Sequence, residues 1–109
     1  MAEGKSDLSE RALEVIEIAK NTGKIKKGVN EATKAAERGT AKLIVYAKDV
    51  SPAELVMHLP IIAKEKGIPC VEVPSKEELG IAAGIQRPTA AVAVLKAGEA
   101  EKIITEMKG

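Results

Sequence analysis

The sequence has almost no aromatic residues. It contains no phenylalanine or tryptophan and one tyrosine, Tyr46, so aliphatic side chains and alanine must fill its core. Its one cysteine, Cys70, excludes an internal disulfide and any cysteine cluster for zinc or iron–sulfur. No apolar run approaches the roughly 20 residues of a membrane span, and the first residues lack the apolar segment of a signal peptide. We therefore expect a soluble cytoplasmic protein with no cofactor, no metal and no membrane partner.

The length and charge of the chain bound its class. With 109 residues, of which 45% are hydrophobic, the chain suits one domain with a single core. No repeat, linker or low-complexity segment divides it, so we expect a single domain over residues 1–109. Its net charge of +1 argues against a general nucleic-acid coat but permits a local basic patch.

Hydrophobic periodicity predicts several helices. Asp7 and Glu10 resemble a capping box at the start of the first, which ends near residues 21–23. A second helix is expected over residues 29–38, followed by Gly39. A third has Ser51 as its N-cap and Pro52 at its first position, with a break or change of direction at Pro60. Two shorter helices follow, one capped by Ser75 and one over residues 99–107.

Short runs of branched and small apolar residues predict the strands between these helices. They are expected at residues 25–27, 43–47, 69–73 and 90–95. Helices and strands thus alternate along the whole chain, which predicts an α/β fold with a sheet between two layers of helices.

No enzyme motif is present, and we predict that the protein is not an enzyme. The glycines at 80 and 84 lack both the lysine pattern of a phosphate loop and the dinucleotide fingerprint. His58, the one histidine, is expected to cap a helix end or lie at the edge of the core. Cys70 lies in a predicted buried strand, where a thiol is usually inert.

Positive charge is concentrated in one segment, residues 22–42. This segment holds six lysine or arginine side chains and two glutamates, a net charge of +4, whereas the whole chain carries +1. On a helical period, one face of the predicted helix collects Asn30, Glu31, Lys34 and Arg38, with Lys27 just upstream. The opposite face is small and apolar, so it suits close packing on the sheet.

This polar face has two interpretations. In the first, it is a solvated surface on which Glu31, Lys34 and Arg38 form a mesh of charges. In the second, it is a binding surface close to a helix N-terminus, whose free N–H groups favour phosphate.

A second candidate surface is the predicted loop over residues 85–89. Ile85, Gln86, Arg87 and Pro88 present an aliphatic group, an amide, a cation and a rigid ring. Beside the helix face, this loop would complete a platform for base edges and an unstacked base, which is how distorted RNA is recognised. A lysine can read guanine O6 and N7, and a carboxylate such as Glu31 can accept the guanine N1 and N2 hydrogens.

The segment from Gly23 to Val94 resembles the L7Ae family, the archaeal large-subunit ribosomal proteins that bind kink-turn RNA. Four ordered motifs carry the resemblance: KKGVNEATKAAERG, KDVSP, MHLP, and GIQRP after SKEELG. The resemblance implies a three-layer α/β/α sandwich with a mixed four-stranded sheet. It also implies a place in the ribosome and, in archaea, in ribonuclease P and in the box C/D and H/ACA guide complexes that methylate and pseudouridylate RNA.

The resemblance also implies roles for individual residues. Asn30, Glu31 and Lys34 would contact the tandem sheared G·A pairs of a kink-turn through the major groove. The RNA backbone would be held nearby by Lys27, Gly28 and Arg38. The loop over the extruded nucleotide would consist of Ile85, Gln86, Arg87 and Pro88.

The expected partners are kink-turns in ribosomal or guide RNA, together with other proteins of the same ribonucleoprotein, and the chain alone is expected to be a monomer. The alternative is a paralogue that keeps the fold and acts mainly as a protein-interaction or regulatory module in the ribosome.

Overall fold

The computed structural model describes the backbone of residues 3–108 and the side chains of residues 8–106. Its sheet has four strands in the order β1-β4-β2-β3. Their bounds are β1 Lys24–Lys27, β2 Leu43–Ala47, β3 Cys70–Val73 and β4 Ala91–Lys96. Strand β4 runs antiparallel to both of its neighbours, whereas β2 and β3 are parallel. The sheet is therefore mixed, as the family resemblance implies.

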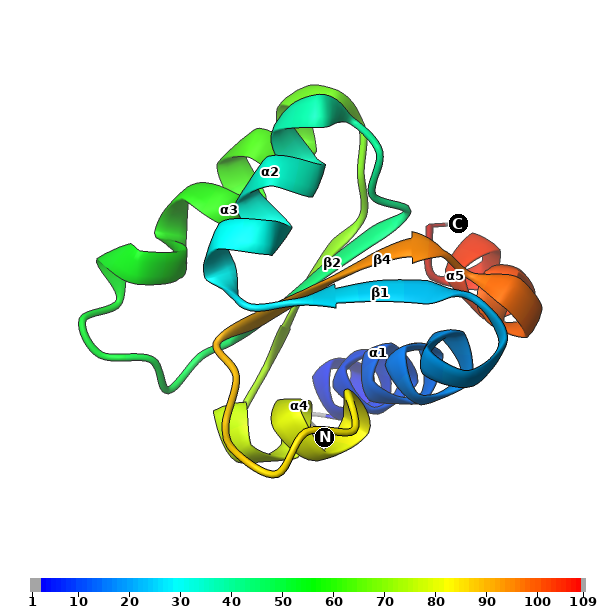
Figure 1. Cartoon of the computed structure of the whole chain (residues 1–109), viewed down its shortest axis with the longest axis horizontal. Helices are drawn as coiled ribbons and strands as arrows, with labels where there is room; N and C mark the ends of the chain where they lie inside the picture. Colours follow the sequence, from blue (N-terminus) through cyan, green and yellow to red (C-terminus); the bar gives the residue numbers. More distant parts are fainter. Residues whose placement is uncertain (1–2, 109) are drawn as a thin grey trace.

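Helices cover both faces of this sheet (Figure 1). Their bounds are α1 Glu3–Thr22, α2 Val29–Arg38, α3 Glu54–Lys66, α4 Lys76–Ala82 and α5 Glu101–Lys108. Helices α2 and α3 pack on one face, and α1, α4 and α5 pack on the other. The predicted three-layer α/β/α sandwich is confirmed. Across residues 3–108, the structure contains no helix with the length and apolar character needed to cross a membrane.

The core consists of two aliphatic layers separated by the sheet. Alternation along a strand directs Leu43 and Val45 toward α1 and α4, and Ile44 toward α2 and α3. Helix α2 contributes alanines to its layer, which allows its backbone to approach the sheet and α3 closely. This close packing fixes the helix that carries the candidate site.

Two predicted helix starts are wrong. Helix α1 begins at Glu3, so Asp7 lies inside the helix and is not its N-cap. No proline precedes Asp7, and Glu3 and Lys5 favour a helix, so nothing stops the helix at that point. Helix α3 begins at Glu54 after Ala53, which makes no side-chain cap, so Ser51 and Pro52 lie in the preceding turn.

The predicted interruption at Pro60 is also wrong, because α3 continues through this residue as one helix. Proline removes one hydrogen bond of the helical ladder and crowds the preceding turn. Val56, Leu59 and Ala63 lie around Pro60 and are all buried against the sheet. Their packing outweighs the local cost of the proline.

Other local predictions are confirmed. Ser75 caps α4, because its hydroxyl oxygen accepts the N–H groups of Glu77 and Glu78 at 3.1 and 3.2 Å. Helix α2 ends at Arg38 before Gly39, as expected. Within α1, Leu8 is 40% exposed beside β3, whereas Ala12, Val15, Ile16 and Ala19 are buried.

Candidate nucleic-acid interface

The start of helix α2 is tied to the first residue of β4. Gly28 connects β1 to α2 with φ 103° and ψ 154°, a conformation open essentially to glycine alone. Its N–H donates to the Ala91 carbonyl at 2.8 Å, and its own carbonyl accepts the Ala32 N–H at 2.9 Å. Among the described residues, no atom outside the adjoining chain lies within 4 Å of the position a Gly28 Cβ would occupy. The outer side of this turn is therefore open to a large ligand.

Packing decides which face of α2 meets solvent. Ala32, Ala35 and Ala36 are buried against β4 and α3. The opposite face is exposed, as predicted, and carries Asn30, Glu31, Lys34 and Arg38, with exposed Lys27 at the end of β1. The helix N-terminus therefore presents amide, carboxylate and ammonium groups together.

The mesh of charges considered from the sequence does not form. Among residues 8–106, no salt bridge involves Glu31, Lys34 or Arg38. Their polar groups therefore remain available to a ligand.

The loop between α4 and β4 is held against α4 by its backbone. The Ile85 N–H donates to the Gly80 carbonyl at 3.0 Å, and the Thr89 N–H donates to the Lys76 carbonyl at 3.1 Å. Gly80 lies so close to this loop that a Cβ there would be 2.2 Å from the Arg87 carbonyl oxygen. Between these anchors, Gln86, Arg87 and Pro88 are exposed and Ile85 is half-buried.

The two predicted surfaces lie at the same end of the sheet. Pro88 is three residues before Ala91, and three residues span at most about 11 Å. Since Ala91 bonds to Gly28, the exposed loop ends close to the start of α2 (Figure 1). The fold thus brings together two segments that are more than 50 positions apart in the sequence.

The sequence did not indicate a hollow between α2 and α3. It has a volume of about 500 Å³ and is lined by Asn30 and Lys34 on one helix and by Glu54 and Leu55 on the other. At its base, Thr33 Oγ1 and His58 Nε2 form a hydrogen bond of 2.7 Å that joins the two helices. His58 is half-buried at the edge of the core, which was one of its two predicted positions. Helical spacing places Leu55 and His58 on one side of α3. This spacing was the one signal in the sequence that could have indicated the α3 side of the hollow.

Cys70 lies away from this interface and is half-buried, not buried as predicted, because β3 is an edge strand. Its partial burial and the nearby Glu72 carboxylate raise the pKa of the Cys70 thiol to about 12. Burial, followed by the charges of Glu72 and Cys70, also raises the pKa of Tyr46. A neutral thiol is a poor nucleophile, so we expect Cys70 to be unreactive.

Comparison with known proteins agrees with this architecture. The model of the ribosomal protein L7Ae/L30e/S12e/Gadd45 family matches residues 10–104. A solved structure, the Giardia lamblia 15.5kD RNA binding protein, is similar with a TM-score of 0.87 and 35% sequence identity. The match covers 94% of this chain and 86% of that one. The chain therefore belongs to the ribosomal protein L7Ae/L30e/S12e/Gadd45 family.

Proposed function

We propose that this protein binds structured RNA and recognises a kink-turn through the exposed face of α2. The observation that carries the proposal is the Gly28–Ala91 hydrogen bond, which holds the start of α2 at the end of the sheet where the exposed loop at residues 85–88 leads into β4. A similar protein, the 15.5kD protein of Giardia lamblia, is described as RNA-binding, and family membership supports the same class of ligand here.

The side chains at the start of α2 match the edges of sheared G·A pairs. The Lys34 ammonium donates to guanine O6 or N7, and the Glu31 carboxylate accepts the guanine N1 and N2 hydrogens. The Asn30 amide, which both donates and accepts, suits an adenine edge. These three exposed groups read the bases.

Neighbouring groups hold the RNA backbone. The free N–H groups at the start of α2 favour phosphate, and Lys27 adds a positive charge beside them. The open space outside Gly28 lets the RNA backbone approach the chain closely. Arg38, one turn beyond Lys34 on the same face, contacts phosphate farther along.

The loop at residues 85–88 covers the nucleotide that a kink-turn extrudes. Ile85 and Pro88 supply apolar surface for an unstacked base, and the Arg87 guanidinium and Gln86 amide supply polar contacts at its rim. In the cell, this RNA is a kink-turn of large-subunit ribosomal RNA, of a guide RNA, or of both, and the protein is one component of that ribonucleoprotein.

A matched pair of RNAs tests this function. The first is a hairpin with a kink-turn and tandem G·A pairs, and the second has those pairs replaced by Watson–Crick pairs. We expect sub-micromolar binding to the first and loss of that binding to the second, measured by calorimetry at one fixed salt concentration. Equal binding to both RNAs would rule out kink-turn recognition and leave only general binding to duplex RNA.

A second candidate function is a protein-interaction module of the same fold. Exposed apolar side chains on α3 favour it, since Leu55, Met57 and Ile61 are 50%, 58% and 61% exposed. Such a module would bind neither RNA of the matched pair tightly, so the same calorimetric experiment separates the two functions.

A further inference from the structure

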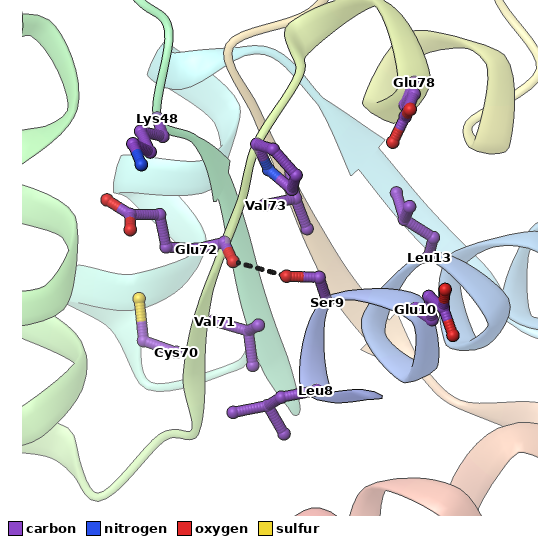
Figure 2. A pocket seen from close by; sticks show the side chains of 11 residues that line it. Leu8, Ser9, Glu10, Leu13, Lys48, Cys70, Val71, Glu72, Val73 and Glu78 are labelled. Carbon is purple, nitrogen blue, oxygen red and sulfur yellow. Dashed lines mark hydrogen bonds between the residues drawn. The ribbon is translucent and has the colours of Figure 1, made fainter. Parts of the chain in front are cut away.

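Strands β1 and β3 form the two opposite edges of the sheet. The outer edge of β3 borders an open groove of about 470 Å³ (Figure 2). The beginning of α1 forms one wall, with Leu8, Ser9 and Leu13. The groove does not include any residue of the α2 face or of the loop at residues 85–88, so it is separate from the candidate RNA interface.

The backbone of β3 offers hydrogen-bonding groups to this groove. The carbonyls of Pro69 and Val73 accept N–H groups from β2 and its end, so they point toward the sheet. Because backbone groups alternate in direction along a strand, those of Cys70 and Glu72 point outward. The Glu72 carbonyl confirms this direction, because it accepts the Ser9 hydroxyl at 3.2 Å. That bond uses one of its two lone pairs and leaves the other free.

The groove reaches around the edge to both faces of the strand. On the face covered by α1, Val71 of β3 and Leu13 of α1 pack against the core, beside the partly exposed Leu8. On the other face lie Cys70 and Glu72 (Figure 2). A ligand that fills this space must therefore run along the strand edge and direct groups to both sides of it, which is the shape of an extended peptide.

The charges around the groove favour a basic ligand. Among the residues whose side chains the structure describes, 8–106, three carboxylates line it, from Glu10, Glu72 and Glu78, against the single ammonium of Lys48. All four of these side chains are exposed. Against the chain's net charge of +1, this groove is locally acidic.

We propose that this groove binds an extended, basic segment of a partner protein, which adds to the sheet beside β3. The outward backbone groups of Cys70 and Glu72 bond the main chain of this segment, and its apolar side chains contact Leu8 and Val71. Its lysine or arginine side chains meet Glu72 on the opposite face, and Glu10 and Glu78 add to the negative charge of the groove. Since β3 has four residues, the bonded part of the partner is short and the binding is weak. A second copy of this chain is disfavoured as the occupant, because edge-to-edge pairing would bring the same carboxylates together from both copies.

The first test uses a capped hexapeptide in which valine and arginine alternate, added to the full-length chain labelled with nitrogen-15. We expect chemical-shift changes centred on the amides of Ser9, Cys70 and Glu72, and no response to the same peptide with glutamate in place of arginine. Absence of binding at millimolar peptide, or shifts centred elsewhere, would overturn the proposal.

Backbone methylation makes the test specific for strand addition. One peptide isomer carries N-methyl groups on its valines and the other on its arginines. In an extended peptide, either the valines or the arginines direct their N–H groups toward β3, but not both. One isomer should therefore lose binding and the other should keep it, whereas equal binding by both would overturn the strand geometry.

Charge variants test the choice of partner. Glu10→Gln with Glu72→Gln should weaken peptide binding about three- to tenfold. Glu14→Gln with Glu17→Gln makes the same charge change on exposed positions of α1 outside the groove and should leave binding unchanged. Kink-turn binding should be the same in both variants. A concentration-dependent dimer that shifts the Cys70 and Glu72 amides without peptide would overturn the proposed occupant.

Discussion

The N–H of Gly28 donates to the carbonyl of Ala91 at 2.8 Å. This bond joins the turn that starts α2 to the first residue of β4, which is three residues after the exposed loop at residues 85–88. Two polar segments from distant parts of the chain therefore lie at the same end of the sheet, and a change at this junction should affect both of them together.

Single lysine substitutions separate base recognition from phosphate contact. Lys34 lies on the exposed face of α2. Lys24 is also exposed, but it lies at the start of β1, at the end of this strand that is farther from α2. Lys34→Ala should weaken kink-turn binding by about 1–3 kcal/mol, the usual scale for a lost base contact. Lys24→Ala should act weakly and mainly reduce the salt dependence of binding. Equal and purely salt-dependent effects, measured by titration at several salt concentrations, would contradict base recognition by Lys34.

Gly28→Ala tests the conformation of the turn. The φ of 103° at Gly28 strains any other residue by about 1–3 kcal/mol, although a Cβ there meets no neighbouring atom. We expect lower stability in urea unfolding and a loss of RNA affinity at temperatures where the variant remains folded. Gly67→Ala is the control, since Gly67 has φ 70° and equally open space at the far end of α3. It should lose stability but keep its RNA affinity, and a matching loss of affinity would contradict a specific role for Gly28.

Thr33→Val tests the hydrogen bond between α2 and α3. The substitution keeps the branched shape but leaves His58 Nε2 without its partner at 2.7 Å. The expected cost in the free energy of unfolding is about 1 kcal/mol. Thr33→Ser retains the hydroxyl and should preserve the bond, so it is the matched control. A valine variant as stable as the parent protein would show that the bond contributes nothing.

The Cys70 thiol should make stability depend on pH in the alkaline range. In the unfolded chain this thiol ionises near its ordinary pKa of about 8.5, whereas burial and Glu72 raise the pKa to about 12 in the folded protein. Between these values the unfolded chain binds fewer protons, so stability should fall as the pH rises above about 9.

Two measurements check this expectation. Urea unfolding at pH 8, 9 and 10 should show the fall, and Cys70→Val should flatten it. Alkylation of the folded protein at pH 8 should be at least about tenfold slower than that of the unfolded chain. Rapid alkylation of the folded protein would contradict a raised pKa.

Much of the fold could be predicted from local sequence because its signals are short-range. The cap at Ser75 and the strand at residues 43–47 each depend on a few neighbouring residues. The continuity of α3 through Pro60 could not be predicted, because it depends on burial against the sheet. The exposure of Leu8 and Cys70 could not be predicted either, because it depends on β3 being an edge strand.

The candidate site divides in the same way. Helical periodicity predicted the exposed face at Asn30, Glu31 and Lys34, which is a local property of α2. That the loop at residues 85–88 lies at the same end of the sheet as the start of α2 follows from the antiparallel pairing of β1 with β4, a contact between distant segments. The hollow between α2 and α3 also requires the tertiary packing of two helices, which no local pattern specifies.

We propose that side chains at the start of α2 read the sheared G·A pairs. A double-mutant cycle measures this contact, with Lys34→Ala in the protein, replacement of the G·A pairs by Watson–Crick pairs in the RNA, and calorimetry at constant salt. We expect a coupling energy of about 1 kcal/mol or more, because each change removes the same contact. Additive effects, with a coupling energy near zero, would contradict it.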